Sequence, residues 1–281
     1  MSEWLLPRTF RSASGDIRWN SLGEPGQAPV VLCHGTPFSS YVWRAVARSL
    51  ARRHQVFVWD MPGYGASQMY AGQDVSLAAQ GRVFAELLAH WGLAEPLVVA
   101  HDFGGAVSLR AHLLHGARYR ALALVDPVAL APWGSPFFRL VGGHWEVFEQ
   151  LPPALHRALV REYIGSASSP GLHPAVLDRL ARPWLGEVGQ AAFYRQIAQA
   201  DQRHTDEIQD RYGEIGIPAL VCWGQEDTWI PPAKGHELTA RIPGARLEPI
   251  TGAGHLVQED APAELTAVLV DFLQSAPDAS D

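Results

Sequence analysis

The sequence predicts an α/β fold in which a mostly parallel sheet is interrupted by one helical insertion. Short apolar runs bounded by glycine and proline alternate with helical patterns, as in a sheet whose two faces are covered by helical crossovers. This alternation stops after Asp126 and resumes near Pro218. A length of 281 residues and a hydrophobic content of 47% suit one large domain that carries an insertion.

The expected elements follow one another along the chain. Strands are predicted at residues 17–22, 29–33, 56–60, 97–100, 121–125, 218–223 and 246–250, and helices at 42–50, 76–91, 105–114 and 263–273. Between residues 131 and 212 the patterns are helical and no convincing strand occurs. We therefore expect a core domain formed by residues 1–130 and 213–281, and a helical cap formed by residues 131–212, called the inserted segment below.

Composition narrows the class of partner. The net charge of −7 gives no electrostatic reason to bind nucleic acid or an anionic membrane surface, and no apolar run approaches the ~18 residues of a membrane span. The first residues lack the basic stretch and apolar core of a signal peptide. The two cysteines, Cys33 and Cys222, lie in apolar strand-like runs and are expected to be buried thiols. We expect a cytoplasmic protein, monomeric or homodimeric, with a small apolar substrate.

The most informative stretch is Leu97–Val107, with the sequence LVVAHDFGGAV. An apolar strand ends, one polar residue follows among small neighbours, and a helix begins. This pattern is typical of a nucleophile elbow, a sharp strand-to-helix turn that raises one side chain above the sheet. The elbow residue is Asp102, where most such turns carry serine. The alternative interpretation is a plain helix start with Asp102 as its N-cap.

Four motifs, in this order, resemble the α/β-hydrolase fold superfamily, in its branch with an aspartate nucleophile. They are the oxyanion loop His34–Pro37 (HGTP), the strand-end turn Asp60–Ser67 (DMPGYGAS), the elbow His101–Gly105 (HDFGG) and the histidine loop Gly252–His255 (GAGH). This branch contains epoxide hydrolases and haloalkane and haloacetate dehalogenases. The resemblance implies a mostly parallel eight-stranded sheet, an inserted cap, and hydrolysis without an organic cofactor or a metal ion.

The resemblance also implies a catalytic triad in the chain order nucleophile, acid, histidine. Asp102 is the expected nucleophile and His255 the expected base. Two positions qualify for the acid. Asp227 follows the strand after the inserted segment, where most of the superfamily keeps its acid, and is favoured. Asp126 follows the preceding strand, where some dehalogenases of this branch keep theirs, and is the alternative.

An aspartate nucleophile has a chemical reason. A carboxylate that attacks a saturated carbon leaves an ester, which a histidine-activated water can hydrolyse, whereas a serine would leave a stable ether. Asp102 would form this alkyl-enzyme ester, and His255 would activate water to attack it. The resemblance assigns the oxyanion hole to the backbone N–H groups of Thr36 and Phe103.

Departures from the family patterns favour an epoxide as the substrate. The related haloalkane dehalogenases bind halide with an indole N–H at the position of Phe103 and an asparagine amide at that of Thr36, and neither residue here supplies that donor. Haloacetate dehalogenases carry arginines after the nucleophile, which are absent from residues 103–106. Dehalogenation, ester or lactone hydrolysis, and a member of the fold that binds a ligand or runs cofactor-free oxygen chemistry remain the alternatives.

An epoxide hydrolase needs an acidic O–H in the cap to protonate the opening oxygen. The inserted segment offers Tyr163, Tyr194, Tyr212, His144, His156 and His204, of which Tyr194 is the expected donor. His34, Trp133 and Trp184 are further candidates to line the substrate pocket.

Overall fold

Eight strands form a single sheet in the order β1-β2-β4-β3-β5-β6-β7-β8. The computed structural model describes residues 3–277. The strands are β1 (Arg8–Ser12), β2 (Gly15–Leu22), β3 (Pro29–Cys33), β4 (Gln55–Trp59), β5 (Leu97–His101), β6 (Ala121–Val125), β7 (Ala219–Gly224) and β8 (Arg246–Ile250). The pairs β1·β2 and β2·β4 are antiparallel and the other five pairs are parallel, so the predicted mostly parallel sheet is confirmed.

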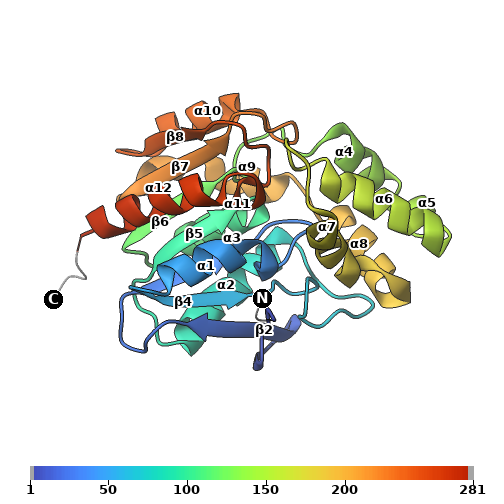
Figure 1. The fold of residues 1–281 in the computed structure, drawn as a ribbon, viewed down its shortest axis with the longest axis horizontal. Coiled ribbons are helices and arrows are strands. Elements are labelled where there is room, and N and C mark those ends of the chain that lie inside the picture. Colours follow the sequence, from blue (N-terminus) through green and yellow to red (C-terminus); the bar gives the residue numbers. More distant parts are fainter. Residues whose placement is uncertain (1–2, 278–281) are drawn as a thin grey trace.

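Helices cover both faces of this sheet. Helix α1 packs beside α12 on one face, and α2 packs beside α3 on the other (Figure 1). The helices of the core are α1 (Arg44–Leu50), α2 (Leu77–His90), α3 (Phe103–His115), α10 (Ala233–Arg241), α11 (Val257–Asp260) and α12 (Pro262–Ser275). Because both faces are covered, the central strands β5 and β6 are buried at every residue.

The segment between β6 and β7 contributes helices and no strand to the described fold. These helices are α4 (Pro136–Gly143), α5 (Trp145–Phe148), α6 (Pro153–Gly165), α7 (Pro174–Ala181), α8 (Gly186–Ala198) and α9 (Arg203–Gln209). Helices α4 to α8 gather at one end of the molecule, beyond the sheet (Figure 1). Helix α9 instead packs against α3, where Arg110 donates to the carbonyl of His204. The last helix of the inserted segment therefore lies against the core.

The core contains three elements that the sequence analysis missed, the edge strand β1, helix α10 and the short helix α11. Both thiols are buried, as expected, and burial raises the pKa of Cys33 and of Cys222. Among residues 3–277, every helix is too short or too polar to cross a lipid bilayer.

Candidate active site

Asp102 sits in a strained turn between β5 and α3. Its backbone has φ = 50° and ψ = −119°, a region that non-glycine residues rarely occupy. The turn requires small neighbours, because a Cβ added to Gly35 would lie 2.3 Å from the Cβ of Asp102. Asp102 occupies the N-cap position of α3, but its side chain makes no capping hydrogen bond. The N-cap interpretation of this motif is therefore wrong, and the carboxylate faces elsewhere.

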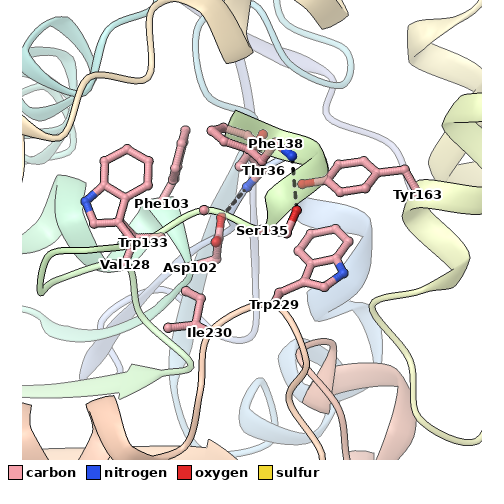
Figure 2. Close-up of a pocket in the computed structure, with 11 residues that line it drawn as sticks. Thr36, Asp102, Phe103, Val128, Trp133, Ser135, Phe138, Tyr163, Trp229 and Ile230 are labelled. Carbon is pink, nitrogen blue, oxygen red and sulfur yellow. Dashed lines mark hydrogen bonds between the residues drawn. The ribbon is translucent and has the colours of Figure 1, made fainter. Parts of the chain in front are cut away.

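The two carboxylate oxygens of Asp102 lie in different surroundings. Oδ1 accepts a hydrogen bond of 2.6 Å from the backbone N–H of Thr36, which follows β3 (Figure 2). Oδ2 lies 3.3 Å from Nε2 of His255, close enough for an ion pair but without hydrogen-bond geometry. Phe103 begins α3, so its N–H has no acceptor within the helix. The Thr36 contact fits the expected oxyanion loop, and Phe103 lies beside it in the pocket lining.

His255 connects the carboxylates of Asp102 and Asp227. Its Nδ1–H donates to Oδ2 of Asp227 at 2.8 Å, and the whole imidazole is buried. Burial by itself would lower the pKa of His255, but the charges of Asp227 and Asp102 outweigh it and raise that pKa well above its usual value. The loops after β5, β7 and β8 thus bring together the three residues expected to form the triad.

The alternative acid, Asp126, lies next to this triad but does not bind His255 directly. It ends β6 with φ = 41°, and its Oδ1 accepts from the backbone N–H of Gly224 at 2.9 Å. His255 takes Asp227 as its carboxylate partner instead. The structure therefore pairs His255 with the favoured residue, Asp227, and not with Asp126.

A small pocket of about 20 Å³ opens onto Asp102, which is room for little more than a water molecule and far below the ~300–1,000 Å³ usual for small-molecule sites. Its apolar lining consists of Phe103, Val128, Trp133, Phe138, Trp229 and Ile230. Polar groups come from Thr36, Asp102, Ser135 and Tyr163. Figure 2 shows the hydroxyl end of Tyr163, from α6, pointing toward Ser135. The pocket thus combines one carboxylate, three hydroxyl-bearing side chains and an aromatic wall.

Tyr194, the expected proton donor, lies outside this pocket lining. Its hydroxyl is 2.9 Å from Nδ1 of His156, whose Nε2 is 2.8 Å from the carbonyl oxygen of Trp184. This network lies within the inserted segment, and the placement contradicts the expectation that Tyr194 faces the substrate. Tyr163 is the tyrosine that lines the pocket. Burial, with a contribution from the charge of Asp102, raises the pKa of Tyr163 well above 10, so its hydroxyl keeps its proton at neutral pH.

Two other pocket candidates have structural contacts instead. His34 is fully buried, and its Nε2 accepts from the backbone N–H of Met61 while Nδ1 lies 2.9 Å from the carbonyl of Gly35. Burial lowers the pKa of His34, which favours the neutral ring that this pairing requires. The indole N–H of Trp184 donates to the carbonyl of Pro37 at 2.7 Å. Both residues hold the oxyanion loop in place, and of the two tryptophan candidates Trp133 lines the pocket.

Sequence reasoning assigned no role to three residues of the site and its surroundings, Trp229, His101 and Ser135. The ring of Trp229 stacks on that of His255 with centroids 5.0 Å apart, and Tyr163 stacks on Trp229 at 4.4 Å. His101 donates from Nε2 to the carbonyl of His255, and burial together with the adjacent His255 lowers the pKa of His101 to about 3. Ser135 caps α4 by accepting from the N–H of Phe138. Of these three residues, Ser135 had a recognisable sequence pattern, because a serine followed by a proline is typical of the start of a helix.

Comparisons with known proteins agree with this fold. A family model described as alpha/beta hydrolase fold matches residues 28–262, so the chain belongs to that family and its class is hydrolase. An alpha/beta hydrolase fold protein from Burkholderia ambifaria has 48% sequence identity and a TM-score of 0.91, with 95% of this chain and 97% of that chain covered.

Two more distant relatives differ in the activity that their names give. Haloalkane dehalogenase 2 from Mycobacterium tuberculosis is 26% identical over 274 residues, covering 94% of this chain and 93% of that protein. A thermophilic esterase from Thermogutta terrifontis has 23% identity and a TM-score of 0.75, with coverage of 93% and 94%. The second of these likenesses concerns the fold alone.

Proposed function

We propose that this protein hydrolyses small apolar epoxides through a covalent ester on Asp102. The observation that supports this most is that the two oxygens of that carboxylate have different partners. Oδ1 is held by the N–H of Thr36, Oδ2 faces His255, and the hydroxyl of Tyr163 lines the same pocket. A nucleophile, a base and a proton donor are the three groups that epoxide hydrolysis needs.

In the first half-reaction, Oδ2 of Asp102 attacks a carbon of the epoxide ring. The bond between that carbon and the ring oxygen breaks, and the oxygen takes the proton of Tyr163, leaving a hydroxyalkyl ester on Asp102 and a tyrosinate. The stacking of Tyr163 on Trp229 and its contact with the Ser135 side chain hold the phenol ring in the pocket wall. The apolar lining favours a substrate with little charge.

In the second half-reaction, His255 removes a proton from water, and the water oxygen attacks Cγ of the Asp102 ester. The charge develops on Oδ1, where the N–H groups of Thr36 and Phe103 stabilise it. Collapse of this intermediate restores the Asp102 carboxylate and releases the second alcohol of a diol, and the proton held by His255 returns to the tyrosinate. Asp227 stabilises the imidazolium that forms during the attack.

Dehalogenation is the second candidate, because one relative bears that name. Displacement of a halide from a haloalkane requires donors that stabilise the leaving anion in the pocket. Both indole N–H groups in the lining are directed to other partners, that of Trp133 to Oγ1 of Thr205 and that of Trp229 to Oγ of Ser166. Phe103 has no donor in its side chain. The pocket therefore favours an epoxide, in which the leaving oxygen stays attached and needs a proton.

The test is turnover of two matched substrate panels by the purified protein. Terminal aryl and alkyl epoxides are compared with 1-haloalkanes of the same chain length, and diol and free halide are measured. The proposal predicts diol formation and no halide release. Halide release without diol formation, or no diol from any epoxide in the panel, would contradict it.

A further inference from the structure

Two buried carboxyl groups lie side by side at the ends of β6 and β7. Asp126 is fully buried and Asp227 is 5% exposed. One donor or acceptor atom each from Asp126, Asp227 and His255 lie within 4.8 Å of one another. Two carboxylates this close in a buried site repel each other strongly, so one of them keeps its proton.

The hydrogen bonds decide which of the two is ionised. Asp227 accepts three: from the backbone N–H of Trp229 at 2.7 Å, from that of Ile230 at 3.0 Å, and from Nδ1 of His255 at 2.8 Å. Asp126 accepts one, at Oδ1. Its Oδ2 is buried and has no N–H or O–H donor among the described residues. A carboxyl oxygen in that position is satisfied when it carries a proton of its own and donates it.

We propose that Asp126 is a neutral carboxylic acid that donates its proton to Asp227, and that it acts as a positioning residue for the triad. The contact helps to orient the Asp227 carboxylate that His255 binds. It also fixes the charge of the site at two carboxylates, Asp102 and Asp227, around one imidazole. Burial and the charge of Asp227 both raise the pKa of Asp126 well above its usual value, in agreement with the geometry.

The catalytic consequence rests on the proposed function. When Asp102 becomes an ester its charge disappears, and Asp227 alone then faces His255. The pKa of His255 falls, so the ring can accept a proton from water. An ionised Asp126 would supply a second negative charge and hold the proton on His255. A neutral Asp126 therefore keeps His255 available as a base.

The titratable groups that face Asp126 come from three elements. Asp227 lies in the loop after β7, His255 in the loop after β8, and the thiol of Cys222 on β7 itself. The thiol of Cys222 adds no negative charge beside Asp126, because burial raises the pKa of this thiol. Asp227 is therefore the negative charge that Asp126 faces.

Infrared difference spectroscopy of the whole protein without substrate tests the protonation directly. Asp126→Asn is the conservative change, since asparagine tolerates φ > 0 and keeps both a donor for Asp227 and an acceptor for Gly224. The matched control is Asp60→Asn, because Asp60 is also buried but accepts at both oxygens, from the N–H groups of Ser40 and Ala66.

The wild-type spectrum at neutral pH should contain the carbonyl band of a protonated carboxyl group that shifts with ¹³C-aspartate and is lost in D126N but kept in D60N. If both variants lost only bands of ionised carboxylates, Asp126 would be ionised in the wild type, and the proposal would be overturned. Because no substrate is present, that outcome would leave the proposed function untouched, whereas failure of the epoxide panel would leave this protonation state untouched.

Unfolding equilibria give a second readout. The pKa of Asp126 is raised in the folded state from 3.8, so above pH 4 the folded protein holds a proton that the unfolded chain releases. The unfolding constant of the wild type should therefore rise relative to that of D126N by about tenfold per pH unit until Asp126 ionises in the folded state. A ratio that stays flat above pH 4 would contradict the proposal.

Discussion

The backbone N–H of Thr36 lies 2.6 Å from Oδ1 of Asp102, so the N–H group expected to serve the oxyanion hole already holds one oxygen of this carboxylate in the free protein. The second oxygen is left to face His255 at 3.3 Å. Under the proposed mechanism, Oδ2 is therefore the oxygen that attacks the substrate, and Oδ1 carries the charge when water attacks the ester. Preorganised donors of this kind cost no reorganisation during the reaction.

The first prediction concerns the proton donor. Tyr163→Phe should slow epoxide opening by ~10²–10⁴-fold, because the alkoxide then lacks an internal acid. Tyr194→Phe is the matched control from the same inserted segment, since its hydroxyl bonds to His156. We expect that variant to lose about 1 kcal/mol of stability with turnover nearly unchanged. Single-turnover kinetics measure the rate of epoxide opening in both variants. Equal losses of rate in the two variants would contradict the role of Tyr163.

The second prediction concerns the contact between the inserted segment and the oxyanion loop. Oε1 of Gln196, on α8, accepts from the hydroxyls of Thr36 at 2.7 Å and Tyr64 at 3.0 Å, and all three groups are buried. Gln196→Met leaves both hydroxyls without this acceptor and should destabilise the fold by about 1–3 kcal/mol. Urea unfolding checks this. A double-mutant cycle with Thr36→Val should give a coupling free energy of at least ~0.5 kcal/mol. Strict additivity of the two effects would show that the contact does not contribute to stability.

The third prediction concerns the base. His255→Gln should still form the ester but should not hydrolyse it, because the glutamine cannot accept a proton from water. Mass spectrometry of the peptide that contains Asp102 should therefore find one substrate mass added after a single turnover. The control is the double variant D102N/H255Q, which should remain unmodified. An unmodified H255Q protein alongside consumed substrate would mean that His255 is not the base.

The fourth prediction concerns pH. Asp227 and Asp102 raise the pKa of His255 in the free protein, and esterification of Asp102 removes one of these two charges. The imidazole of the ester form must lose its proton before it can act as a base, so hydrolysis should slow as the pH falls. Rapid-quench mass spectrometry should find a larger steady-state fraction of esterified protein at acid pH than at alkaline pH. A fraction that does not change with pH would argue against base catalysis by His255.

The sheet was predictable because its strands are buried on both faces. The apolar runs of β3, β5, β6 and β7 are continuous, and their ends lie within about two residues of the predicted ones. β1 escaped prediction because its sequence RTFRS is polar and mostly exposed at the sheet edge. Helix α10 (AKGHELTAR) buries only Gly235 and Leu238, which is too little to leave a clear apolar pattern.

The candidate site also contains residues that the sequence predicts and residues that it does not. Asp102, Thr36, Asp227 and His255 lie in turns whose glycines and spacing are visible in the sequence. The pocket wall is not, because α6 and α8 each bury a tyrosine and only their packing decides that Tyr163 faces the pocket while Tyr194 turns to His156. Trp229 is placed on His255 by the turn that Asp227 caps, and such a turn carries no signal for what the next side chain covers.

The most direct test of the central claim is multiple turnover of an epoxide in ¹⁸O-water, followed by mass measurement of the peptide that contains Asp102. If water attacks Cγ of an ester on Asp102, the label must enter the Asp102 carboxylate and appear in the diol from the following turnovers. We predict ¹⁸O in this peptide. Diol formation without any label in Asp102 would contradict the covalent mechanism, because water would then have attacked the epoxide directly.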